Sequence, residues 1–130
     1  MQFININGMR GVGKTSFAKS ISRKFGYPIF EEEIEKQFPH SQLSKVYTGE
    51  VKHTHRNLFL SQCYILESQK IKMYRALEAL ERNEGVICIS HPIALYYIYI
   101  IPYFQIGCYT SGDLEFFYNV VYEDFSYPNP

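Results

Sequence analysis

Three glycines stand close together near the start of the chain, directly ahead of a lysine and a threonine. Residues 8–15 read Gly-Met-Arg-Gly-Val-Gly-Lys-Thr, which fits in full the pattern of a glycine, four residues and then Gly-Lys-Ser/Thr. Glycines let the backbone curl so that several N–H groups point into one concavity, which binds anionic oxygen. In such a loop Lys14 reaches the β- and γ-phosphates of ATP, and Thr15 offers its hydroxyl to Mg²⁺.

The phosphate loop requires a strand before it and a helix after it, and the flanking residues satisfy both requirements. Residues 1–6 alternate between apolar and polar side chains, as in a short strand. Downstream, Phe17, Ala18 and Ile21 share one helical face. Arg10, inside the loop, either contacts the γ-phosphate or faces water. The predicted nucleotide-binding residues are Gly8, Arg10, Gly11, Val12, Gly13, Lys14, Thr15 and Ser16.

The composition narrows the range of partners. The chain has 130 residues, which is enough for one domain, and it carries 13 basic and 13 acidic side chains. A zero net charge argues against bulk binding of a nucleic acid polymer, which needs a basic face. Twelve tyrosines and ten phenylalanines, without any tryptophan, could serve a core, an interface or a nucleobase pocket. We therefore expect a small-molecule ligand.

The cysteines and the apolar segments indicate a cytoplasmic protein without a membrane partner. The three cysteines, Cys63, Cys88 and Cys108, are widely spaced and form no C-x-x-C pair, so we expect reduced and mostly buried thiols. We expect no signal peptide, because the first apolar segment is too short and lacks a basic start. The longest apolar stretch, residues 93–106, contains Pro102 and is too short to span a bilayer.

The middle of the chain predicts a second strand, a long helix and a third strand. Ile29 and Phe30 form a brief apolar pair, and a polar region that we interpret as loop follows over residues 39–54. Residues 57–82 carry one helical pattern that ends at a glycine. Its predicted apolar stripe is Leu58, Cys63, Leu66, Met73, Leu77 and Leu80. Residues 86–89 are a continuous apolar run, which is typical of a strand buried on both faces.

The last third of the chain predicts helices. Residues 93–105 are nearly all apolar or tyrosine, so a helix kinked at Pro102 and a strand are both compatible with them, and the alternation of elements favours the helix. Thr110 and Asp113 resemble a capping box that opens a helix through about Phe125. The alternating order of strands and helices predicts one α/β domain over residues 1–130, a parallel sheet with flanking helices.

Some nucleotide-binding classes are excluded by motifs that the sequence does not contain. A GTPase needs an Asp-x-x-Gly switch and an Asn-Lys-x-Asp guanine reader, and neither string occurs. A motor ATPase has an apolar strand that ends in Asp-Glu, whereas the strong later strand here ends in Ser90. Small-molecule kinases remain.

Four segments together resemble the P-loop kinases of the deoxynucleoside kinase and thymidylate kinase group, over their amino-terminal two-thirds. The first is the phosphate loop. The second, "FEEEIEKQF", is similar to the Glu-Pro-Val-x-x-Trp segment of deoxynucleoside kinases. The third, "LFLSQCYILESQ", is similar to their Phe-Gln-Thr-Tyr segment, and "VICISHPIALYY" stands in the place of their strand ending in Asp/Glu-Arg-Ser. The resemblance implies an ATP- and Mg-dependent kinase of a nucleoside or nucleotide.

The resemblance also implies roles for single residues. Lys14 is expected to act in catalysis, and Glu32 stands where the family has its catalytic carboxylate, the general base for the attacking hydroxyl. Gln62 stands where a glutamine reads the nucleobase, and Glu32, Gln62 and His91 are the expected substrate-binding residues. On the residues alone, the acidic run is also typical of a solvated turn, and Gln62 of a polar helix surface.

The chain departs from the family in several places. Ser90 and His91 replace the acidic-Arg pair, and Gln69 replaces an arginine seven residues after Gln62. The sequence stops at Pro130, where the family continues with further strands and a lid, so we expect a domain incomplete at its C-terminus. By the resemblance, the third strand lies between the other two. The first strand is then an exposed apolar edge, which predicts self-association.

Two alternatives stay open beside a deoxynucleoside kinase. The acceptor could be a nucleoside monophosphate, as in thymidylate kinases, or another small metabolite. The chain could also be a nucleotide-binding regulatory module without catalysis, which the lost acidic-Arg pair favours, whereas Lys14, Thr15 and Glu32 favour the enzyme.

Overall fold

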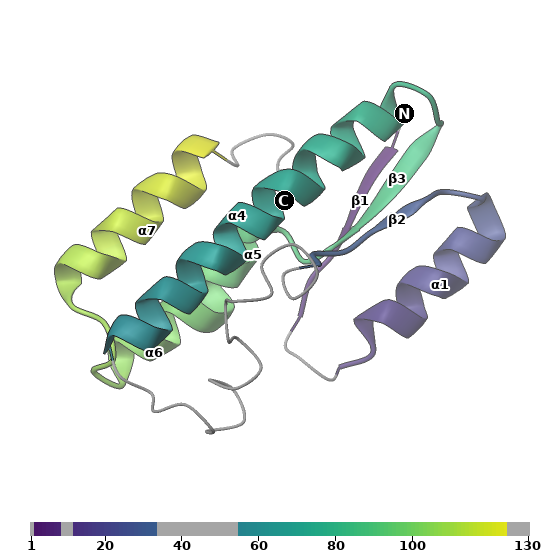
Figure 1. Cartoon of the computed structure of the whole chain (residues 1–130). Helices are drawn as coiled ribbons and strands as arrows, with labels where there is room; N and C mark the ends of the chain where they lie inside the picture. The colour runs from purple at the N-terminus through teal and green to yellow at the C-terminus, as the bar shows by residue number, and fades with distance from the viewer. Residues whose placement is uncertain (1, 9–11, 34–54, 125–130) are drawn as a thin grey trace.

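The computed structural model describes residues 2–8, 12–33 and 55–124 (Figure 1). Three short strands and a set of helices alternate along this part of the chain, as the sequence predicts. The elements are β1 (Gln2–Ile6), α1 (Lys14–Phe25), β2 (Ile29–Phe30), α4 (His55–Leu80), β3 (Gly85–Ile89), α5 (Pro92–Leu95), the π-helix η2 (Tyr96–Ile100), α6 (Ile101–Gln105) and α7 (Ser111–Asp124). None of the described helices is long and apolar enough to cross a membrane.

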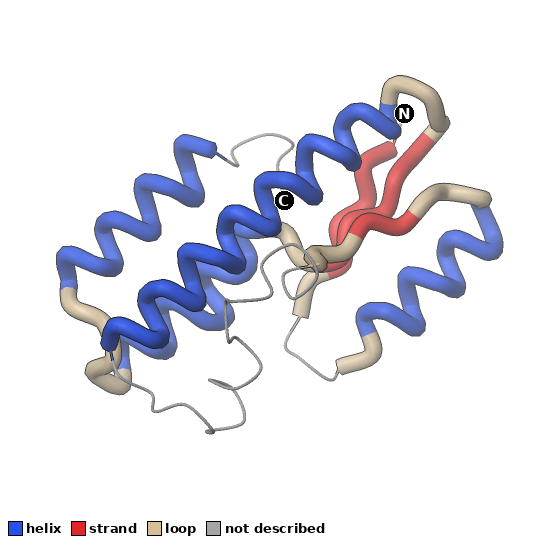
Figure 2. Tube along the Cα trace, viewed as in Figure 1, coloured by secondary structure: helices blue, strands red, loops and turns tan. Residues whose placement is uncertain are grey.

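The strands form one parallel sheet in the order β1-β3-β2 (Figure 2). Ile87 at the centre of β3 is in register with Ile4 on one side and Ile29 on the other. All five residues of β3 are buried, as its continuous apolar run predicts. The prediction that the third strand lies between the other two is confirmed.

Helices cover the sheet on both faces (Figure 1). Alternate residues of a strand point to opposite faces, so Ile87 and Ile89 pack with Ala18 of α1, whereas Val86 and Cys88 belong to the core on the α4 side. The core on the α4 side extends beyond the sheet. There, aromatic side chains of η2 and α7 pack against the first half of α4. The fully buried members of this part of the core include Ile100, Phe117 and Val121.

The segment that was ambiguous in the sequence is helical and contains a π turn. The Ile101 N–H donates to the Tyr96 carbonyl, five residues back, instead of four. Pro102 follows directly, and its ring lacks an N–H and crowds the carbonyl four residues before it. The change in hydrogen-bonding pattern thus occurs just before the proline. The strand alternative for residues 93–105 is wrong.

The last helix begins at the predicted capping box. The Thr110 N–H donates to Asp113 Oδ2 at 2.9 Å, and the Asp113 N–H donates to Thr110 Oγ1 at 3.1 Å. These reciprocal bonds satisfy two donors that a helix N-terminus leaves without partners. The capping box is confirmed, and the predicted final residue, Phe125, lies outside the described residues.

The buried face of α4 corrects the predicted apolar stripe. Leu58, Leu66 and Met73 are buried, but the other three members of the stripe are only partly buried. Their places are taken by polar side chains, since the buried positions of α4 include Ser61, Gln62, Ser68, Gln69 and Lys72. At the Lys72 end of this face, the ammonium donates to backbone carbonyls of Ile89 and Ser90. That face leads to the carboxyl end of β3.

The three thiols are free, but only Cys88 is buried. Cys63 and Cys108 are partly exposed, so the expectation of mostly buried thiols was correct for one of the three. Cys88 is buried because it lies on the inner strand of the sheet. Burial raises its pKa to about 11, with Lys72 opposing the shift, so the thiol stays protonated at neutral pH.

Candidate nucleotide-binding site

The described part of the phosphate loop has the backbone geometry that its glycines allow. Gly13 has a φ of 90° and is the N-cap of α1, without a side chain that caps the helix. A Cβ at Gly8 would lie 2.9 Å from Val12 Cγ2, so a larger residue would displace that side chain. The helix therefore begins with N–H groups available to an anion. Arg10 and Gly11 lie outside the described residues, and their contacts stay predictions.

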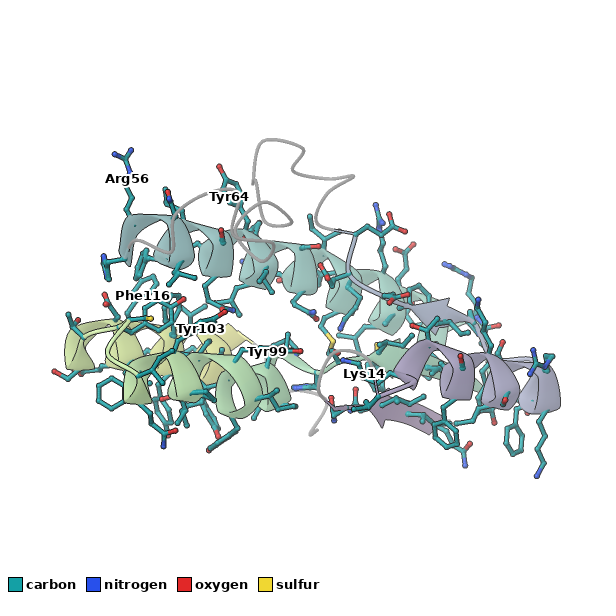
Figure 3. The ribbon with its side chains drawn as sticks, turned by 90° about the horizontal axis from the view of Figure 1, so that it is seen from below. Lys14, Arg56, Tyr64, Tyr99, Tyr103 and Phe116 are labelled. Carbon is teal, nitrogen blue, oxygen red and sulfur yellow. The ribbon has the colours of Figure 1, made fainter. Side chains whose placement is uncertain are left out.

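Lys14 joins the loop to the sheet. Its Nζ donates to the Gly8 carbonyl at 2.8 Å and to Ser90 Oγ, at the end of β3, at 3.1 Å. Partial burial lowers its pKa, and the carboxylates of Glu31 and Glu32 act in the opposite direction. Figure 3 shows Lys14 between the sheet with α1 and the helices that follow β3. The ammonium is thus at the strand ends, where α/β proteins bind nucleotides.

The acidic run after β2 lies beside the first turn of α1. Thr15 Oγ1 donates to Glu31 Oε1 at 3.4 Å on the surface. Glu32 is partly buried, whereas Glu31 and Glu33 are exposed. A hydroxyl and a carboxylate oxygen this close are the hard oxygen donors that Mg²⁺ prefers, so Thr15 and Glu31 fit a magnesium site. Ser16 is exposed in the same turn.

The turn after β3 is strained and fully enclosed. Ser90 has a φ of 67°, a left-handed conformation that is uncommon outside glycine. Its N–H donates to the Ile6 carbonyl at 2.8 Å, and the next N–H, of His91, donates to Asn7 Oδ1 at 2.7 Å. Both bonds tie the end of β3 to the end of β1, so they fix the approach to the phosphate loop.

His91 is placed differently from an exposed substrate-binding residue. Its side chain is fully buried, and Nδ1 accepts a hydrogen bond from the Ile93 N–H at 3.1 Å. The ring therefore caps α5, which has Pro92 at its first position. A substrate contact by His91 remains a prediction, and it would have to use the other ring nitrogen.

Two buried polar residues of α4, Lys72 and Gln69, were not among the predicted site residues, although Gln69 was noted as a departure from the family. Lys72 is 3 % exposed, and its Nζ donates to the Ile89 carbonyl at 2.9 Å and also to the Ser90 carbonyl. Gln69 is 1 % exposed, and its Oε1 has no hydrogen-bond partner among the described residues. The signal was present as a spacing: Gln62, Gln69 and Lys72 are seven and three residues apart and share a helical face.

The predicted site residues do not all gather at one point. Lys14, Thr15 and the acidic run lie with Ser90 at the strand ends. Gln62 is buried on α4, ten residues before Lys72, which corresponds to about 15 Å along the helix axis. The strand-end residues, which Lys72 contacts, and Gln62 therefore lie at opposite ends of the buried polar stripe of α4, which Gln62, Gln69 and Lys72 form. Near the Gln62 end, α4 and the helices after β3 share an apolar cluster formed by Tyr64, Ile65, Leu95 and Tyr99.

The comparison with solved structures relates this arrangement to a kinase. The chain is similar to the structure of deoxyadenosine kinase from M. mycoides with bound dATP, with a TM-score of 0.66 and 20 % sequence identity. The likeness shows a P-loop kinase-like fold. It covers the whole of this chain but only 60 % of the length of the kinase. No protein-family profile matches the sequence, and no curated protein does so either.

Proposed function

We propose that this chain transfers a phosphoryl group from ATP to a nucleoside, with Mg²⁺ as cofactor. The observation that supports this function best is the position of Lys14. Its ammonium lies between the glycine loop and Ser90, within the electrostatic influence of Glu31 and Glu32. A phosphate-binding lysine and two carboxylates at the same strand ends are the groups that phosphoryl transfer needs. The similar solved structure, a deoxyadenosine kinase with bound dATP, supports the same class.

The donor phosphates are held by the loop and by α1. The Lys14 ammonium has three donors, of which Gly8 and Ser90 take two, so the third can bind a phosphate oxygen. The first N–H groups of α1 add donors aligned with the helix dipole. Thr15 and Glu31 would hold a magnesium ion, which would neutralise charge on the phosphates. This part of the site positions the phosphoryl group and stabilises its charge.

The acceptor hydroxyl is deprotonated by a carboxylate of the acidic run. Glu32 is the proposed general base, because it is the partly buried member and is close enough to influence both Lys14 and Lys72. Glu31 is committed to the first turn of α1 through Thr15. Each carboxylate then has a separate role.

The acceptor lies along the buried polar stripe of α4. Gln62 is 4 % exposed, and an amide side chain can make a two-point hydrogen bond to a base edge. Tyr64 and Tyr99 belong to the apolar cluster beside it, which suits the flat face of a base. The acceptor is therefore a nucleoside with its 5′-hydroxyl toward Glu32.

A second candidate is nucleotide binding without transfer. It is favoured by the end of β3, where Ser90 and the enclosed His91 stand in place of an acidic-Arg pair. The two functions share the phosphate loop but differ in turnover.

The deciding experiment incubates the chain with labelled ATP, Mg²⁺ and a panel of nucleosides and nucleoside monophosphates. Transfer of label to a nucleoside supports the kinase, and transfer to a monophosphate supports the thymidylate kinase-like alternative. Lys14→Ala is the negative control. If calorimetry shows tight ATP binding but no acceptor gives a labelled product, the result supports the second candidate, nucleotide binding without transfer.

A further inference from the structure

A buried ammonium lies behind the turn at the end of β3. Lys72 extends from α4, is 3 % exposed, and donates to the carbonyls of Ile89 and Ser90. Among the described residues it forms no ion pair. Burying a lysine without an ion pair is costly, and hydrogen bonds offset part of that cost. One of its two bonds goes to Ser90, which has the left-handed φ.

Ser90 is held by a contact on each of its polar atoms. Its N–H donates to Ile6, its carbonyl accepts from Lys72, and its Oγ accepts from Lys14. The left-handed φ of 67° persists because these contacts together outweigh the strain. The Lys72 bond acts on the carbonyl, so it controls the orientation of the peptide and, through it, the direction of the side chain. The hydroxyl of Ser90 thereby meets the Lys14 ammonium.

We infer that Lys72 is a positioning residue for the phosphate loop: it fixes the Ser90 turn, and the Ser90 hydroxyl fixes the Lys14 ammonium before a nucleotide binds. The inference rests on the proposed function for the nucleotide contact of Lys14. The first link, from Lys72 to Ser90, is independent of it.

The electrostatic surroundings of Lys72 agree with this role. Cys88 on β3, Glu31 and Glu32 after β2, and Lys14 on α1 all act on its charge. Lys72 therefore brings a second positive charge to the strand end that the phosphate-binding lysine occupies.

The test compares Lys72→Met with Lys70→Met, a matched change on the same helix. Both variants are first checked for folding by urea titration. Hydrogen exchange of the Ser90 amide is then measured by NMR, and ATP affinity by calorimetry with Mg²⁺ present. We expect Lys72→Met to speed Ser90 exchange and to weaken ATP binding by about tenfold each, the size of one lost hydrogen bond to a charged group. Lys70→Met should leave both unchanged, and Lys72→Arg, which keeps charge and donors, should recover part of the affinity.

A merely structural role predicts another result. Lys72→Met would then lower the free energy of unfolding but leave ATP affinity and Ser90 exchange in the folded protein as in Lys70→Met, which would overturn the inference. If Lys72→Met does not fold, Lys72→Gln is measured in the same way against the same outcomes. If the unchanged protein binds no ATP, the proposed function fails, while Ser90 exchange still decides the link from Lys72 to Ser90.

Discussion

The Lys14 ammonium donates to the Ser90 hydroxyl at 3.1 Å, across 76 residues of sequence. This bond joins the glycine loop to the end of the central strand, β3. Lys14 also donates to the Gly8 carbonyl, so the residue proposed to bind phosphate also holds the loop.

Removing the Lys14 ammonium should weaken ATP binding without unfolding the protein. We expect Lys14→Ala to weaken ATP affinity roughly tenfold or more, because charged hydrogen bonds to phosphate are lost. The variant should stay folded, with the free energy of unfolding lowered by about 1–3 kcal/mol for the two lost hydrogen bonds. Calorimetry and urea titration measure the two effects, with Lys19→Ala on the exposed face of α1 as the control. Equal ATP affinity in both variants would contradict the phosphate assignment.

Substitutions of Glu31, Glu32 and Glu33 should have different effects on the reaction. We expect Glu32→Gln to lower turnover about a hundredfold or more while ATP affinity stays close to that of the unchanged protein, as for a general base. Glu31→Gln should raise the Mg²⁺ concentration needed for half-maximal rate, because Glu31 contacts Thr15. Glu33→Gln, an exposed neighbour, is the control. Steady-state kinetics across Mg²⁺ concentrations distinguish them, and full activity of Glu32→Gln would show that another carboxylate is the base.

Stability should depend on pH through Lys72. Its pKa is lowered from 10.5 to about 8, chiefly by burial, so the unfolded chain binds more protons above pH 8. The free energy of unfolding therefore rises with pH in that range, by at most about 1.4 kcal/mol per pH unit. The raised pKa of Cys88 acts in the opposite direction only above about pH 9, so pH 8 to 9 is the window. Urea titrations should show this rise in the unchanged protein and lose it in Lys72→Met; equal slopes would contradict it.

The N-terminus of α7 should respond to acid. Burial tends to raise the pKa of Asp113, but hydrogen bonds from Thr110 and His55 outweigh it, and the pKa is lowered overall. The stabilisation by Asp113 is thus present above its ordinary pKa of 3.8 and is lost as the pH falls through the lower folded value. At neutral pH, Asp113→Asn keeps an acceptor for the Thr110 N–H but loses the negative charge at the helix N-terminus, so it should cost about 0.3–1 kcal/mol.

Thermal melts of Asp113→Asn and of Glu115→Gln, an exposed acid on the same helix, measure this loss at two pH values. The difference between them should disappear in strong acid. A difference that persists there would mean that the carboxylate charge is not the cause.

The chain should associate with itself. Aromatic side chains on α7 and η2 are about half exposed: Phe116 at 47 %, Tyr118 at 46 % and Tyr97 at 53 %. Within the described sheet, β1 pairs only with β3, so its other edge is open. Sedimentation velocity over a wide dilution range should show concentration-dependent species, reduced in Phe116→Ser with Tyr118→Ser. A cooperative monomer at every concentration would contradict the prediction.

The parts of the fold that follow from local pattern could be predicted from the sequence. The glycine loop, the apolar run of β3 and the capping box at Thr110 each carry a short-range signal. The helical state of residues 93–105 could only be favoured, because apolar residues at nearly every position leave no period to read. The strand order came from the resemblance rather than from the residues, and the structure agrees with it.

The site was harder to predict where it depends on contacts between distant segments. Lys72, Gln69 and Gln62 are polar residues on a long helix, and such residues usually face solvent. Only the packing of α4 over β3 shows that they are buried. The left-handed φ of Ser90 has no sequence signal, because serine is not a residue that requires it. The contact of Thr15 with Glu31 likewise depends on how β2 lies beside α1, which the sequence does not show.

The π turn at Tyr96–Ile100 has a consequence for chain length. Such a turn holds one residue more than an α-helical turn, so it is an insertion accommodated inside a packed helix. Loss of one residue from this segment would restore a regular helix while Leu95 before it and Ile101 after it kept their faces. Most buried segments tolerate no change in length. Here the loss of one residue is a step that evolution, or an engineer, can take without dismantling the surrounding core.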